Sequence, residues 1–265
     1  REHDNSLGDF LEGALSDVPT LSEEEKEITD EAFTYEEATR YVRSHLKNGK
    51  SLGSSGFPAE FFKVFWSCLG RHSVNKMNHS HERGLLSTIQ RQGIITLIPK
   101  PGRDPATLKG YRPISLLNTW YKICSGILAE RLKKLLPKLI HPDQAGFVQG
   151  RYIGDVIRNV LDITHYAKTK KIKGLILSAD MDSGFDRLSH SCIEKALGIF
   201  NFGPWYRRAI KMLLTDNFSN VNMCGFLSKK INVSRSAHQG DPIAPYLFIL
   251  CLEFLAIKVR PVSCF

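Results

Sequence analysis

Close cysteine pairs, a secretory leader and a membrane-length apolar run are all missing from this 265-residue sequence. The six cysteines include no C-x-x-C pair, so neither a disulfide framework nor a common zinc motif is indicated, and reduced thiols in an intracellular protein are expected. The first residues lack the basic start and apolar core of a secretory signal. The longest apolar run, residues 243–257, contains Glu253 and is too short to span a bilayer. It predicts a buried helix and no membrane partner.

Acidic residues are scarce except at the beginning of the chain. Residues 1–40 contain 13 Asp and Glu against 3 Lys and Arg, whereas the remaining residues contain 14 against 33. Such a basic body is expected of a protein that binds nucleic acid, although solvated surface lysines would give the same composition. The acidic residues 1–33 have few periodic apolar positions and predict a flexible lead-in. The chain begins with Arg1, which indicates a piece of a longer protein.

The order of the expected elements favours an α+β fold. Thr34 and Glu37 form a capping box before a helix that we expect to end at Gly49, and residues 119–136 form a long amphipathic helix. "GIITLIP" and "KGLILSAD" read as strands, and Pro204 opens a helix. Ser191 is expected to cap a helix, and Asp241 to cap the apolar one. Residues 220–236 resemble a hairpin that turns at Gly225 and Phe226, so the order is not the regular alternation of a doubly wound sheet.

Asp180 is the residue from which a catalytic site can be predicted. It follows the apolar segment Leu175–Ala179, and Asp182 and Asp186 lie close behind it. Grouped carboxylates repel one another unless a cation lies among them, which favours a metal site over an ordinary strand-ending turn.

The segment "LSADMDSGFDRLSH" resembles the first catalytic motif, D-x-x-K-A-F-D-x-x-x-H, of reverse transcriptases from non-LTR (LINE-type) retrotransposons. The resemblance implies that Asp180 is a ligand shared by two catalytic Mg²⁺ ions, and that the backbone carbonyl of Met181 helps to hold one of them. It also implies that Phe185 tests the incoming nucleotide for a ribose 2′-hydroxyl, and that Ser183 and Gly184 lie against that nucleotide.

Four further segments resemble the same family, in the family's order, over about residues 30–258. "GKSLGSSGFPAEFFKVFW" is similar to an upstream signature. "IITLIPKPGRD" with "GYRPISLLN" implies that Lys100 and Arg112 meet the triphosphate. "HPDQAGFVQGR" implies template contacts by Gln144, Gly146, Phe147 and Arg151. "RSAHQGDPIAPYLFIL" implies that Gln239 and Gly240 border the nucleotide.

The family resemblance implies a right-hand polymerase: residues 34–170 would form the fingers region and residues 171–265 a partial palm. The partners would be an RNA template, a DNA primer and deoxynucleoside triphosphates. The family's Y/F-A-D-D hairpin, which carries the remaining metal-binding aspartate, and the thumb are not recognisable before Phe265. We therefore expect weak Mg²⁺ binding and little polymerase activity from this chain alone.

Some positions depart from the family pattern. Ser183 and Gly184 replace Lys-Ala, His238 replaces an arginine, and Ser54 and Ser55 replace the Pro-Asp of an upstream loop. A non-catalytic nucleic-acid-binding remnant and a purely structural interaction module therefore remain alternatives. Group II intron maturases and viral RNA polymerases are related alternatives, but Phe185 argues against an RNA polymerase.

Overall fold

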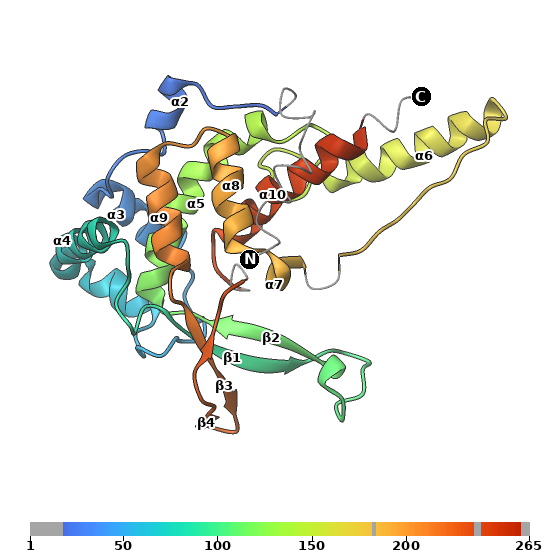
Figure 1. Ribbon diagram of the computed structural model, residues 1–265. Helices are drawn as coiled ribbons and strands as arrows, with labels where there is room; N and C mark the ends of the chain where they lie inside the picture. Colours follow the sequence, from blue (N-terminus) through green and yellow to red (C-terminus); the bar gives the residue numbers. More distant parts are fainter. Residues whose placement is uncertain (1–17, 182–183, 236–239, 261–265) are drawn as a thin grey trace.

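The computed structural model describes residues 18–181, 184–235 and 240–260, which form a helical body with a β-sheet arm (Figure 1). Within these ranges the helices are α2 (Glu23–Glu27), α3 (Tyr35–Ser44), α4 (Ala59–Arg83), α5 (Thr119–Leu139), α6 (Ile153–Thr169), α7 (Gly184–Arg187), α8 (His190–Ile199), α9 (Pro204–Leu214) and α10 (Ala244–Val259). The strands are β1 (Gln92–Pro99), β2 (Tyr111–Leu116), β3 (Phe218–Met223), β4 (Phe226–Leu227) and β5 (Ile231–Asn232). The α+β class is thereby confirmed.

The sheet is mixed and has the strand order β2-β1-β3-β4, with β5 also paired to β3. β1 and β2 form an antiparallel hairpin, whereas β1 and β3 are parallel and join segments more than a hundred residues apart in the chain. β3 and β4 meet at a two-residue turn, Cys224–Gly225, in which both residues have positive φ. The predicted hairpin is confirmed, and its turn lies one residue earlier than expected.

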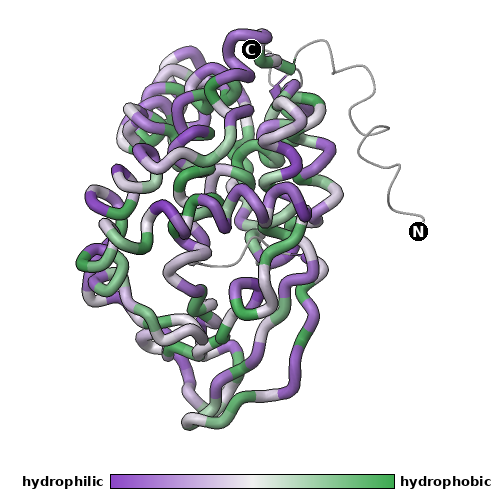
Figure 2. Tube along the Cα trace, turned by 90° about the vertical axis from the view of Figure 1, so that its left-hand side faces the viewer, coloured by the Kyte–Doolittle hydropathy of each residue, from purple (hydrophilic) through white to green (hydrophobic). Residues whose placement is uncertain are grey.

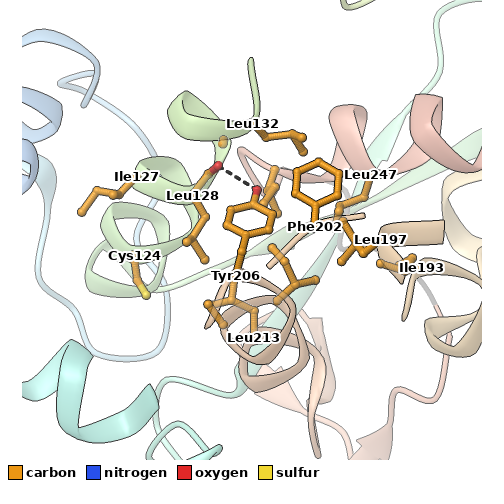
Figure 3. Packing of buried hydrophobic residues seen from close by; sticks show 14 of the residues in the cluster. Cys124, Ile127, Leu128, Leu132, Ile193, Leu197, Phe202, Tyr206, Leu213 and Leu247 are labelled. Carbon is orange, nitrogen blue, oxygen red and sulfur yellow. Dashed lines mark hydrogen bonds between the residues drawn. The ribbon is translucent and has the colours of Figure 1, made fainter. Parts of the chain in front are cut away.

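The core lies around α5, which contacts α3, α4, α9 and α10. Figure 2 shows hydrophilic and hydrophobic residues alternating along the helices, as amphipathic helices require. Tyr206 of α9 is fully buried, and its hydroxyl donates a 2.9 Å hydrogen bond to the Leu128 carbonyl of α5 (Figure 3). Buried apolar side chains from α5, α8, α9 and α10 surround it, including Ile127, Leu132, Ile193, Leu197, Leu213 and Leu247.

Two predicted helices start where the sequence indicated. α5 covers the expected residues 119–136 and continues to Leu139, and Pro204 is the first residue of α9. The apolar helix α10 is packed into the body, and its buried Glu253 accepts a 2.7 Å hydrogen bond from Arg260 Nη1. None of the helices in the described ranges is long and apolar enough to cross a membrane.

Several predicted boundaries were wrong. α3 ends at Ser44 rather than Gly49, and α8 begins at His190 after Ser189, so Ser191 is not its cap. α10 begins three residues after Asp241, although the Asp241 carboxylate accepts a hydrogen bond from the Ile243 N–H at 3.2 Å as well as those from the Tyr121 and Ser125 hydroxyls of α5.

The described part of the acidic lead-in is folded, contrary to the expectation of flexibility. Val18, Leu21 and Phe33 are buried, and Leu21 N–H donates to the Phe200 carbonyl at 3.0 Å. Ser22 and Glu25 form a complete capping box at α2. Three apolar anchors without periodic spacing, together with hydrogen bonds from Arg131 to the Thr29 and Ala32 carbonyls, hold residues 18–33 on the body.

The expected strand at Leu175–Ala179 is not formed. These residues are extended but unpaired, and Leu175 and Leu177 are 91% and 85% exposed. A strand requires a hydrogen-bonded neighbour, and no strand among the described residues lies beside this segment. Residues 175–179 therefore have the apolar pattern of a strand but lack the hydrogen bonds to a neighbouring strand that would make them one.

Burial of tyrosine predicts that the fold loses stability in alkali. Burial raises the pKa of Tyr206 and of Tyr121 well above the usual value near 10. As pH rises, the unfolded chain releases these phenol protons before the folded chain does. The contribution of each buried tyrosine to the free energy of unfolding is therefore complete below about pH 10 and falls above it by about 1.4 kcal/mol per pH unit. In urea titrations above about pH 10, Tyr206→Phe should reduce this slope, and the matched change at exposed Tyr152 should not. Equal slopes for both variants would contradict the prediction.

Candidate active site at the first motif

Asp180 lies at the end of the exposed segment that follows α6. Asp180 and Met181 are both exposed and belong to no helix or strand, and α7 begins at Gly184. Met181 and Gly184 line a groove of 370 Å³ together with Phe248 of α10. The carboxylate of the first motif is therefore open to solvent beside a partly apolar groove. Ser183 and Gln239, together with Asp182 and His238, lie outside the described residues.

Three phenylalanines bring together three of the predicted motif segments. The ring of Phe185, in α7, stacks on Phe248 of α10 at 4.7 Å between centroids. Its other neighbour is Phe147 of the 141–151 loop, at 6.3 Å and nearly perpendicular. Gly184 leaves room for this arrangement, because a β-carbon there would lie 3.1 Å from the Phe248 ring. The first motif is thus positioned by the segments implied to hold template and nucleotide.

Gly240 and Asp241 fix the start of the α10 segment against α5. Gly240 has a φ of +108°, and a β-carbon there would lie 3.2 Å from the Ser115 carbonyl of β2. Asp241 is buried; it accepts hydrogen bonds from the Tyr121 hydroxyl at 2.7 Å and from the Ser125 hydroxyl. Burial, followed by the Asp241 charge, raises the pKa of Tyr121, so the phenol remains a donor. A backbone position that only glycine adopts easily is thereby held next to β2.

Lys100 and Arg112 lie on the β1–β2 arm rather than beside Asp180. Lys100 follows β1 and its Nζ donates to the Lys109 carbonyl at 3.1 Å, while exposed Arg112 is paired in register with Ile98. In the described part of the chain, neither side chain forms an ion pair with Asp180. The structure therefore places both cations on one hairpin but does not bring them into contact with the first motif.

Arg151 has its hydrogen-bonding groups occupied within the chain. Its guanidinium donates to the carbonyls of Pro137, Ile140, His141 and Gln144, at 2.6 to 3.1 Å. It thus joins the end of α5 to the loop that carries Gln144, Gly146 and Phe147. The family resemblance implies a template contact for Arg151, and the geometry shows that this residue also positions the loop.

The described residues offer few ligands for a metal ion. Among them, no group of three or more His, Cys, Asp or Glu side chains is placed to hold one. Asp186, which follows Phe185 in α7, is exposed. Oxygen ligands suit Mg²⁺, but one exposed carboxylate and a backbone carbonyl provide only part of an octahedral shell.

Sequence reasoning missed two groups that shape the site. Phe248 was named only as part of a helix, and its stacking on Phe185 depends on a contact between distant segments. Cys192 and Cys251 line the same groove, and a hydrogen bond from Cys251 lowers the pKa of the Cys192 thiol. No local sequence pattern indicates either contact.

Comparison with known proteins agrees with the motifs. The family model described as "Reverse transcriptase (RNA-dependent DNA polymerase)" matches residues 98–264. The chain is 31% identical over 245 residues to the "Transposon TX1 uncharacterized 149 kDa protein" of Xenopus laevis, covering 92% of the chain and 19% of that protein. It is 30% identical over 168 residues to a Pol polyprotein from the type-1 retrotransposable element R2 of Popillia japonica, covering 62% and 23%.

A third relative is the "RNA-directed DNA polymerase from mobile element jockey" of Drosophila melanogaster. It is 27% identical over 157 residues, which cover 58% of the chain and 17% of that protein. The chain thus spans about a fifth of the length of these relatives. The family model and these relatives agree with the five motif segments, and the chain belongs to the reverse transcriptase family, in the group of non-LTR retrotransposon RNA-directed DNA polymerases.

Proposed function

We propose that this chain provides the fingers and part of the palm of an RNA-directed DNA polymerase that extends a DNA primer on an RNA template. The observation that carries the proposal is the meeting of three motif segments at the rings of Phe147, Phe185 and Phe248. Residues 147, 185 and 248 are distant in the chain, yet their rings meet, and Met181, next to Asp180, lines the groove beside Phe248. A polymerase needs its catalytic carboxylate, template loop and nucleotide-binding segment together in this way.

In this proposal Asp180 and the Met181 carbonyl are the chain's ligands for two Mg²⁺ ions, which would activate the primer hydroxyl and stabilise the leaving pyrophosphate. Lys100 and Arg112 contact the triphosphate, Lys100 as a point charge and Arg112 as a planar fork. The β1–β2 arm must then bend toward the groove when a nucleotide binds.

The remaining site residues contact the nucleotide and the template. Phe185, held by Phe248, tests for the ribose 2′-hydroxyl. The other proposed nucleotide contacts are Ser183, Gly184, Gln239 and Gly240. The template contacts are Gln144, Gly146 and Phe147, and Arg151 fixes the loop that carries them.

We further propose that the 265-residue chain alone binds nucleic acid but extends primers weakly or not at all. Support comes from the exposure of Asp180 and from the unpaired state of the segment before it. Mg²⁺ demands near-ideal octahedral geometry, which one exposed carboxylate cannot impose. A remnant that only binds nucleic acid is the second candidate, supported by the basic body of the chain.

A combined binding and extension assay tests the proposal. The chain should retain an RNA–DNA primer–template on a filter at low salt and release it as salt rises, because phosphate contacts depend on counterion release. Primer extension with Mg²⁺ and deoxynucleotides should give no product above background. Robust extension would contradict the weak metal site, and binding that is absent or independent of salt would contradict both candidates.

A further inference from the structure

A polar cavity lies on the other side of α8 from the first motif. It has a volume of 680 Å³, within the range of about 300–1,000 Å³ that is usual for ligand sites. Its walls come from α8, α9, the segment between α9 and β3, the region of β5 and Arg91. In Figure 1 the lower end of α9 leads directly into β3 at this place. The groove at Met181 is lined by different residues, so the two hollows are separate.

The cavity combines an apolar floor with a polar rim. The apolar residues are buried and come from α8 and α9: Ile193, Leu197, Ile210 and Leu214. Hydroxyl and amide side chains surround them, namely Ser191, Thr215, Asn217, Asn232 and Ser234. A ligand with a flat, partly apolar body and polar edges would match both surfaces.

The charges of the cavity are not balanced. Lys211 pairs with Glu194 at 3.1 Å, and Arg91 with Asp216 at 3.6 Å. Two more cations line it, Arg207 and Lys230. In the described part of the chain neither is paired with an acid, and Lys230 Nζ lies 4.4 Å from the Phe218 ring. The surplus positive charge favours an anionic ligand.

Among the residues that the structure describes, two buried polar groups at the cavity have no hydrogen-bond partner. Asn217 is 3% exposed, and its Nδ2 donates to the Leu213 carbonyl at 2.6 Å, but its Oδ1 has no hydrogen-bond partner. Arg91 Nε is likewise buried and unsatisfied. Buried polar groups without partners are costly, so a ligand that supplied a donor or an acceptor here would be favoured.

We propose that this cavity binds a nucleotide unit of single-stranded RNA, with its base and sugar over the apolar floor and its phosphate between Arg207 and Lys230. Stacked or apolar contact with the base and cationic contact with the phosphate are the usual means of binding single strands. The choice of RNA as the ligand rests on the proposed function. The location does not, because the cavity shares no residue with the proposed catalytic groove. The site would hold the strand away from the reacting atoms.

The test compares charge reversals by fluorescence anisotropy with a labelled oligoribonucleotide of about eight nucleotides. Arg207→Glu and Lys230→Glu should each weaken binding by about three- to tenfold. Each should also reduce the slope of the logarithm of the binding constant against the logarithm of the salt concentration by about 0.7, the value for one lost phosphate contact on a single strand. Arg43→Glu is the matched control, since Arg43 is exposed on α3 and does not line the cavity. Circular dichroism confirms that each variant is folded.

The outcomes separate this proposal from the proposed function. If Arg207→Glu and Lys230→Glu bind the oligoribonucleotide as Arg43→Glu does, the cavity proposal fails. The proposed triphosphate contact is tested separately, because Arg112→Glu should weaken binding of a labelled deoxynucleoside triphosphate. Unchanged triphosphate binding in Arg112→Glu contradicts the nucleotide site and leaves the cavity proposal standing. Displacement of the oligonucleotide by an equal concentration of free UMP would overturn the assignment to a strand.

Discussion

Asp180→Asn is expected to abolish primer extension in any longer form of this protein that extends primers, with a loss of at least about 10³-fold. The substitution keeps the size of the side chain but removes the negative charge that would hold two metal ions. Affinity for the RNA–DNA substrate should stay within about twofold, because that affinity depends on cations and phosphates. Single-turnover extension with saturating substrate measures the chemical step, and filter binding measures the affinity.

The matched control is Asp162→Asn, because Asp162 is exposed on α6 and lies outside the groove at Met181. It should extend primers at the wild-type rate. If Asp180→Asn retained extension, another residue would have to hold the metal ions. If instead it lost RNA affinity and activity together, Asp180 would have a structural role.

Arg131→Ala is expected to cause the largest loss of stability, about 3–5 kcal/mol in the free energy of unfolding. Arg131 is 5% exposed, and its guanidinium makes a two-pronged contact with Glu37, with both distances 2.7 Å. It also donates to the carbonyls of Thr29, Glu31 and Ala32 and lies over the ring of Trp205. Its removal leaves a carboxylate and three carbonyls without their donor.

Urea unfolding followed by circular dichroism measures this effect. Arg131→Lys should recover only part of the loss, because an ammonium group cannot reproduce the planar fork. The control Arg43→Ala removes an exposed arginine from α3 and should change the free energy of unfolding by less than about 0.5 kcal/mol. A similar small change for Arg131→Ala would show that residues 18–33 are not held by this contact.

The sequence was most informative where local chemistry decides the structure. Pro204 starts α9 because its missing N–H costs nothing at the first helical position. The apolar periodicity of residues 119–136 was enough to predict α5. The family was also predictable, because its motifs are short segments in a fixed order that can be read without the fold.

Contacts between distant segments were not predictable. The segment Leu175–Ala179 has the apolar residues of a strand, but strand formation depends on a neighbour that the sequence of the segment does not specify. Arg151 lies in a segment that resembles a template contact, and the sequence does not indicate that its guanidinium donates hydrogen bonds to the Pro137 and Ile140 carbonyls at the end of α5. Asp241 was expected to cap α10, and its carboxylate accepts from the Ile243 N–H, but it is also bound by the hydroxyls of Tyr121 and Ser125 of α5. In each case the partner lies elsewhere in the chain.

The central claim, that Asp180 holds the catalytic metal, is tested most directly by iron-mediated cleavage of the chain. Fe²⁺ replaces Mg²⁺, and with ascorbate and peroxide it cuts the backbone next to the place where it is bound. In a longer form of the protein that extends primers, with a deoxynucleoside triphosphate present, the account predicts fragments that end near residue 180, and none there when the same form carries Asp180→Asn. Fragments near residue 180 that persist in Asp180→Asn, or cleavage only at other positions in the wild-type chain, would contradict it.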